Sequence, residues 1–153
     1  INNNKKILPT LLSRCINFKI SLSNNESLKI ANELLSFKLS EYINKDLLNY
    51  YLSPGNIYNL VIFAKNYDYD LANLNLKNFL KIIINDKHYR KDNFIKFFIY
   101  DLIEFYLNKI NFSFSLNLSK EYSYFLKRIS DIKKFNLDEE SLFIEFEDQI
   151  LNG

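Results

Sequence analysis

One arginine stands out among the basic side chains of this sequence. The chain has 20 Lys and Arg residues, of which only three are Arg. Arg14 lies in the stretch ILPTLLSRCINFKI, between Ser13 and Cys15 and after a proline-started apolar turn. A guanidinium group presents a fixed pair of N–H donors that suits phosphate oxygens. The first question is therefore whether Arg14 does chemistry of that kind or is simply solvated.

The sequence patterns of self-sufficient active sites are missing elsewhere. With two Gly in total there is no glycine-rich phosphate loop, and one Cys with one His cannot build a zinc site without carboxylates. His88, in the segment DKHYRK, is interpreted as an ordinary surface histidine. The carboxylate pairs Glu139/Glu140 and Glu147/Asp148 fall on amphipathic helix faces, which favours solvation over acid–base work. We expect no catalytic centre, no metal and no cofactor in this chain.

Composition bounds the class of protein. The chain has 153 residues, 48% of them apolar, which is enough for a real core, and its net charge is only +2. A single Cys excludes an internal disulfide, and no apolar run reaches the length of a membrane span. We expect a soluble, cytoplasmic protein. The chain contains no Met, even at position 1, so we also expect it to be part of a longer reading frame.

The aromatic and basic residues have two interpretations. The 11 Tyr and 14 Phe resemble base-stacking platforms in number, but they fall at core spacing, as in NFIKFFIYDLIEFYL. The densest basic cluster is at helical spacing and is interpreted as a solvated stripe: Lys127, Arg128, Lys133 and Lys134. A binder of single-stranded nucleic acid stays open as an alternative, although the near-neutral charge argues against it.

The first half of the chain predicts one short strand followed by three helices. Residues 16–20 alternate apolar and polar side chains, which predicts a strand. The segment SNNE fits a capping box that starts a helix at residues 23–37. Further apolar periodicity predicts helices at 40–51 and 56–66, separated by the helix-breaking SPG. Three short helices with short connections form a small bundle.

The second half predicts further helices. The polar segment at residues 66–75 marks a module boundary, and helices are expected at 74–84, 92–108, 119–135 and 138–151. The helix at 92–108 has only a narrow polar stripe, so it must be covered on most sides and is expected at the centre. The predicted fold class is therefore mainly all-α, with one short N-terminal strand.

Three stretches carry a resemblance to a known family. ILPTLLSRC resembles the Ser-Arg-Cys motif that closes the ATPase-type domain of clamp-loader subunits of the AAA+ family. LSPGNIYNL resembles a lid-helix segment of the delta-prime kind of these subunits in bacterial DNA polymerase III. FNLDEESLFIEFEDQILNG resembles the C-terminus of alphaproteobacterial delta-prime chains. The resemblance implies three parts: residues 1–20 as the end of the AAA+ core, 21–70 as a three-helix lid, and 71–153 as a helical collar domain.

The resemblance also implies a role for each motif residue. Arg14 would act as an arginine finger on the Mg-ATP of a neighbouring subunit, with Ser13 and Cys15 in supporting roles. Gly55 stands where hydrolysing subunits have a nucleotide-sensing arginine, which favours a subunit that does not hydrolyse ATP itself. The implied partners are the gamma/tau-type ATPase and delta subunits, and through the assembly the sliding clamp, primer-template DNA and a DNA-directed DNA polymerase.

One alternative does not depend on the resemblance. The alternative is a helical protein–protein interaction module unrelated to replication, in which the Ser-Arg-Cys triplet is accidental and Arg14 is merely solvated. This alternative predicts no alternating strands and helices in the residues encoded before Ile1.

Overall fold

The computed structural model describes residue 14 and residues 22–48, 52–113 and 119–153. Helices are the only regular elements within these ranges, which confirms the all-α expectation in its coarse form. The strand predicted at residues 16–20 lies outside the described residues. The finer division into an AAA+ remnant, a lid and a collar stays a prediction.

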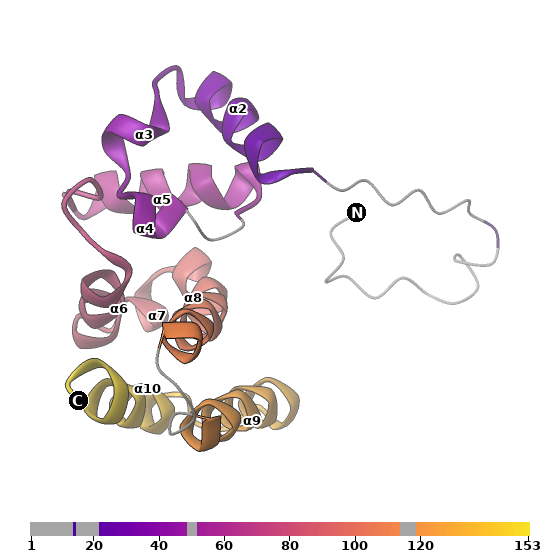
Figure 1. Ribbon diagram of the computed structural model, residues 1–153, viewed down its shortest axis with the longest axis vertical. Helices are drawn as coiled ribbons and strands as arrows, with labels where there is room; N and C mark the ends of the chain where they lie inside the picture. The colour runs from indigo at the N-terminus through magenta and orange to yellow at the C-terminus, as the bar shows by residue number, and fades with distance from the viewer. Residues whose placement is uncertain (1–13, 15–21, 49–51, 114–118) are drawn as a thin grey trace.

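The helices lie in two groups, one above the other in Figure 1. The upper group consists of α2 (Asn24–Leu35), α3 (Leu39–Tyr42), α4 (Lys45–Leu48) and α5 (Pro54–Asn66). The lower group consists of α6 (Leu76–Asn85), α7 (His88–Lys91), α8 (Asn93–Ser113), α9 (Ser119–Phe135), α10 (Glu140–Phe146) and a final π-helical turn, η1 (Glu147–Leu151).

Local signals start α2 as predicted, whereas α5 begins at Pro54, two residues earlier than predicted, so SPG also forms the start of this helix. The Ser23 hydroxyl accepts from the backbone N–H of Glu26 at 3.3 Å, and the Glu26 carboxylate accepts from the backbone N–H of Ser23 at 2.7 Å. This reciprocal pair is the predicted capping box, so that prediction is confirmed. At α5 the Ser53 hydroxyl accepts from the backbone N–H of Asn56 at 3.2 Å, and Pro54 takes the first helical position, where a missing N–H costs nothing.

The single helix predicted at residues 40–51 is wrong, because the described part of it is broken in two. Ile43 has an extended backbone between α3 and α4. The side chain of Asn44 caps the new start by accepting from the backbone N–H of Asp46 at 2.9 Å. The backbone N–H of Asn44 is donated to the carbonyl of Leu71 at 2.8 Å, so a contact with a distant segment competes with the helix.

The long helix α8 is central, as its narrow polar stripe predicts. It packs against α6, α7 and α9, and most of its apolar residues are buried. One aromatic residue breaks the pattern: Phe97 lies in the polar stripe and is 71% exposed. The predicted bounds of α9 agree with the structure, and the predicted helix at 138–151 corresponds to α10 together with η1.

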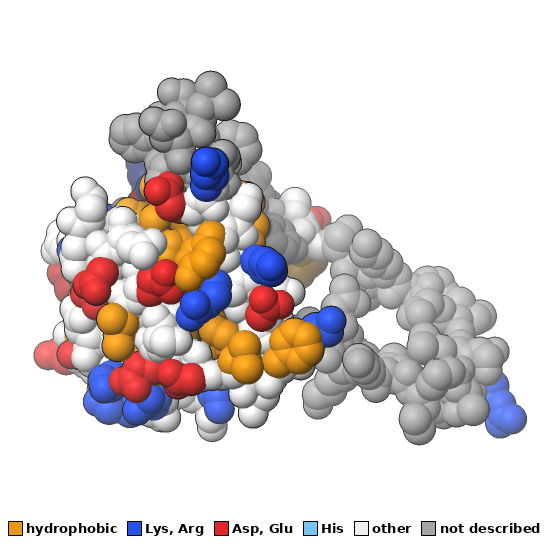
Figure 2. All heavy atoms as spheres, turned by 90° about the horizontal axis from the view of Figure 1, so that it is seen from below, with side chains coloured by type: hydrophobic (Ala, Val, Ile, Leu, Met, Phe, Trp, Pro, Cys, Tyr) orange, Lys and Arg blue, Asp and Glu red, His pale blue; other side chains and the backbone are white. Residues whose placement is uncertain are grey.

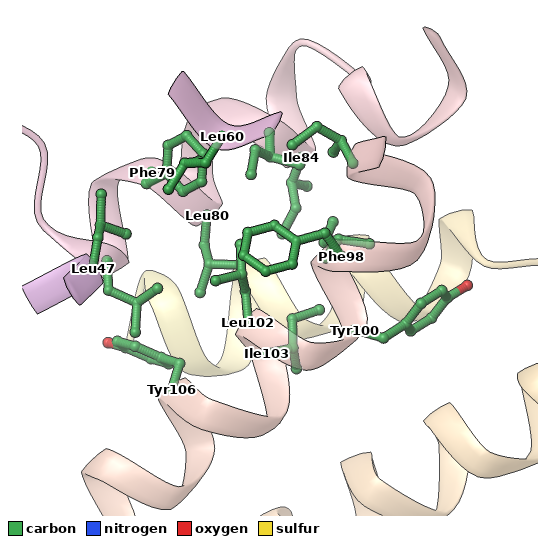
Figure 3. Packing of buried hydrophobic residues seen from close by; sticks show 14 of the residues in the cluster. Leu47, Leu60, Phe79, Leu80, Ile84, Phe98, Tyr100, Leu102, Ile103 and Tyr106 are labelled. Atoms are coloured by element: carbon green, nitrogen blue, oxygen red, sulfur yellow. The ribbon is translucent and has the colours of Figure 1, made fainter. Parts of the chain in front are cut away.

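One continuous set of buried apolar residues joins the two groups of helices. Figure 3 shows buried side chains of this core from α6 and α8. Leu47 of α4 and Leu60 of α5 belong to the same core and are labelled there too. The rings of Phe63 in α5 and Phe79 in α6 meet edge to face, with centroids 6.2 Å apart. The shared core therefore holds the upper helices against the lower ones.

Candidate functional site

Arg14 lies in a turn, and its side chain is exposed. No ion pair joins it to another residue that the structure describes. A finger on another molecule requires an exposed guanidinium, because its paired N–H donors have to reach the phosphate oxygens of that molecule. Ser13 and Cys15 lie outside the described residues, so their supporting roles stay predictions.

Gly55 occupies the second position of α5, directly after Pro54. It is exposed and has an ordinary helical backbone, since neither Gly of the chain has a positive φ. A Cβ added there would meet only the Ser53 hydroxyl oxygen, at 4.0 Å. The backbone and the described surroundings of position 55 therefore admit a Cβ, so no backbone constraint requires Gly there.

Replacing Gly55 by Ala is expected to raise the free energy of unfolding by about 0.5–1 kcal/mol. The substitution reduces the conformational freedom of the unfolded chain, and the added Cβ comes no closer than 4.0 Å to an atom of the described residues. Urea denaturation at neutral pH measures the difference. A loss of stability would mean that the Cβ meets a neighbour that the described residues do not contain.

A carboxylate ties the short helix α4 to the lower group of helices. Asp46 accepts from the backbone N–H of Leu76, the first residue of α6, at 3.2 Å, and it forms an ion pair with Lys109 of α8. Burial would raise the pKa of Asp46, but the hydrogen bonds from Lys109 and Leu76 outweigh burial and hold the pKa below its ordinary value. Asp46 therefore accepts a hydrogen bond from the N-terminus of α6. It links α6 to α4, to which Asp46 belongs, and to α8 through Lys109.

Replacing Asp46 by Asn is expected to lower the free energy of unfolding by about 1 kcal/mol at neutral pH, because Asn can still accept from Leu76 but loses the charge that pairs with Lys109. The native pKa of Asp46 is depressed, so its contribution is present above the unfolded pKa and disappears as the pH falls through the native pKa. Denaturation of both proteins at pH 7 and pH 2.5 measures this.

The control for Asp46→Asn is Glu33→Gln, which removes one negative charge from an exposed position of α2 that makes no ion pair with a described residue. We expect Glu33→Gln to leave the stability at pH 7 unchanged. An equal loss of stability in both variants would assign the effect to net charge rather than to the tie with Lys109.

The sequence interpretation of His88 as a surface residue is wrong. His88 is 2% exposed, and the rings of Phe63, Tyr67 and Tyr69 surround it. These rings come from α5 and the turn after it, so the contact joins residues about 20 positions apart that no local pattern connects. Burial lowers the pKa of His88, because the low-dielectric surroundings disfavour the imidazolium form.

The paired carboxylates of α10 serve as structural acceptors. Glu140 accepts from Lys87 and from Arg90, each at 2.7 Å, which ties α10 to α7. Glu139 accepts from the Tyr100 hydroxyl at 2.7 Å. Burial, together with this bond to Glu139, raises the pKa of Tyr100 above its usual range. The prediction that this pair takes no part in acid–base chemistry stays a prediction, but both carboxylates hold donors from distant segments.

A shallow pocket of about 300 Å³ opens beside α5. Its lining is mainly aromatic and aliphatic, with Lys65 and Asp68 as the charged members, and the Lys65 ammonium lies 5.5 Å from the centroid of the Phe37 ring. No glycine-rich backbone faces this pocket, so it is unlike a phosphate cradle. The described residues contain no group of three or more His, Cys, Asp or Glu side chains placed to hold a metal ion.

Comparison with protein-family models, with curated proteins and with solved structures finds no match for this chain. None of the helices that the structure describes has an apolar stretch long enough to cross a bilayer. The candidate site therefore rests on the residues themselves. It consists of one exposed arginine placed shortly before the capped start of α2.

Proposed function

We propose that this chain is the C-terminal part of a non-hydrolysing delta-prime subunit of a bacterial DNA polymerase III clamp loader. In that role it helps to load the sliding clamp onto primer-template DNA by giving Arg14 in trans to the ATP site of a neighbouring gamma/tau-type subunit. The observation that carries the proposal is the exposed Arg14, which has no ion-pair partner among the described residues and precedes the helices in the chain.

In this proposal the neighbouring subunit and this chain supply different parts of one ATP site. The neighbour binds Mg-ATP and positions the attacking water. Arg14 then supplies two parallel N–H donors to the phosphate oxygens, whose negative charge grows as the bond to the leaving group breaks.

Exposed apolar side chains support packing of the lower helices into a larger assembly. Figure 2 shows hydrophobic side chains among charged ones on the face formed by α9 and α10. The exposed large apolar residues of these helices and their connection are Tyr124, Phe135, Leu137 and Ile144. Side chains of this size on a surface are typical of a protein contact when they gather in one region.

The structure gives one observation against direct nucleic-acid binding through the basic cluster of α9. Arg128 lies 3.6 Å from the Glu145 carboxylate, and Lys133 lies 3.3 Å from that of Glu104. Two of the four basic side chains are therefore partly neutralised by neighbours within the chain. Phosphate binding driven by counterion release needs basic groups that are not already paired.

Reconstitution tests the proposed assembly. The full-length subunit that contains this chain is mixed with the gamma/tau-type and delta subunits encoded by the same genome, and the mass of the product is measured by light scattering after size exclusion. The proposal predicts one copy of this subunit in each complex. Elution of this subunit alone, while the other subunits assemble without it, would support an unrelated helical interaction module instead.

A further inference from the structure

His88 is the buried end of a short polar chain that runs through Tyr69 to the exposed carboxylate of Asp86. Its Nε2 lies 2.7 Å from the Tyr69 hydroxyl oxygen, which lies 2.9 Å from the Asp86 carboxylate. The other ring nitrogen, Nδ1, is buried and has no hydrogen-bond partner among the residues that the structure describes. A buried ring nitrogen without a hydrogen-bond partner is uncommon. It matters here because a second proton on the imidazole would have to bind to one of the two ring nitrogens.

The network assigns the proton of the neutral imidazole. The Asp86 carboxylate can only accept, so the Tyr69 hydroxyl donates to it. The Tyr69 oxygen is then free to accept from Nε2–H of His88. Nδ1 is therefore the unprotonated nitrogen. A second proton would have to bind there, where the described residues offer no acceptor for the new N–H.

The surroundings of His88 differ on the two sides of α7. On one side are the rings of Phe63, Tyr67 and Tyr69, with centroids 5.1, 4.2 and 5.7 Å from that of the imidazole. On the other side Lys87 and Arg90 hold α7 to Glu140 of α10. Disruption at His88 therefore affects the contact with α5 first and leaves the tie to α10 in place.

We propose that His88 is a proton-operated latch, in which binding of a proton at Nδ1 separates α7 from the aromatic cage of Phe63, Tyr67 and Tyr69. The imidazolium would carry a buried charge and an N–H without an acceptor, and both are relieved when the turn after α5 moves away and water enters. The latch is a property of this chain alone and does not rest on the proposed role in clamp loading.

Some of the charged side chains around His88 favour its protonated form and others oppose it. Asp86, whose carboxylate lies 3.7 Å from Nε2, and Asp92 favour the imidazolium, whereas Lys91 opposes it. Burial is the largest effect and lowers the pKa of His88 below its ordinary value. The unfolded or open form therefore binds the proton first. The closed latch is fully stable above about pH 6.5 and weakens as the pH falls below that value.

Titration of the imidazole by NMR tests the latch directly. The chain contains one His, so every imidazole signal belongs to His88. In the full chain we expect the neutral form to carry its proton on Nε2 and the midpoint to lie below about 6.5, the ordinary value for His. A midpoint at or above that value would overturn the proposal, because it would mean that the rings bind the imidazolium by cation–π attraction.

Hydrogen exchange at one amide reports whether the cage opens. The backbone N–H of Tyr69 donates to the carbonyl of Ala64 at 2.8 Å in the closed state. Between pH 7.5 and 5 its protection factor, corrected for intrinsic exchange, should fall by about sevenfold if the midpoint lies one pH unit below 6.5, and by at most about 30-fold for a lower midpoint. Constant protection across the titration would contradict opening of the cage.

The control variant is His88→Gln, whose amide can donate to the Tyr69 oxygen but cannot be protonated. We expect its Tyr69 amide to keep constant protection over the same pH range. An equal loss of protection in His88→Gln and in the unchanged chain would assign the pH effect to other groups and overturn the latch. If His88→Gln does not fold, the imidazole titration of the unchanged chain still decides the proposal.

Discussion

Phe79→Ala is expected to lower the free energy of unfolding by about 3–5 kcal/mol. The side chain of Phe79 is 0% exposed, and its ring meets that of Phe63 edge to face across the contact between α6 and α5. Removing the ring takes away buried apolar area and leaves a cavity between the upper and lower groups of helices. Figure 3 labels Phe79 among the buried side chains of the core.

Phe97→Ala is the matched control, because it deletes the same atoms from a side chain that is 71% exposed on α8. We expect its effect on stability to stay within about 0.5 kcal/mol of zero. Urea denaturation followed by circular dichroism measures both variants. Similar losses for Phe79→Ala and Phe97→Ala would mean that Phe97 is covered in solution by a second molecule, or that the core is not closed at Phe79.

On the proposed role, Arg14→Ala is expected to slow ATP hydrolysis by about a thousandfold at the ATP site to which Arg14 would be given. The loss is large because the donors of an arginine finger act on charge that grows in the transition state. Arg14→Lys should restore little of the rate, because an ammonium cannot give two parallel hydrogen bonds to phosphate oxygens. Binding of ATP by the neighbouring subunit should change much less than its hydrolysis.

Arg128→Ala is the control for Arg14→Ala, because it removes the same charge and side chain elsewhere in the chain. Arg128 already donates to the Tyr124 hydroxyl and to the Ser141 hydroxyl, each at 3.2 Å, so its donors are used within the chain. We expect hydrolysis at the adjoining site to be unchanged in this variant. A similar loss of rate in both variants would point to assembly rather than to a contact with ATP.

Local signals in the sequence predict most of the helices correctly. The capping box of Ser23 and Glu26 and the proline at the start of α5 act over three or four residues, so they are readable without knowledge of distant contacts. The narrow polar stripe of α8 predicts its central place, because an apolar circumference has to be covered by other elements.

Contacts between distant segments account for the errors. The break after Tyr42 arises because Asn44 donates its backbone N–H to Leu71, which has no signature within the helix itself. The burial of His88 likewise depends on rings from α5. The charged residues around His88 in the sequence favour an exposed position. The only signal for a buried one is the aromatic segment NYDY upstream, which contains Tyr67 and Tyr69.

The sequence predicts less of the candidate site than of the fold. The exposure of Arg14 agrees with a finger role, but the function of a finger is expressed only in the site of another molecule, which no pattern within this chain describes. The tie between Asp46 and Lys109 was also missed, because 63 positions separate the two residues and each looks like an ordinary surface charge. Both residues act through partners that are far away in the sequence.

The central claim is tested most directly by single-turnover hydrolysis at the adjoining ATP site. In a reconstituted clamp loader the other ATP sites are silenced by substitutions in their own phosphate loops, and the rate of phosphate release is compared between the unchanged chain and Arg14→Ala. We expect a rate about a thousandfold lower for Arg14→Ala. An equal rate in the two complexes would contradict a finger role for Arg14.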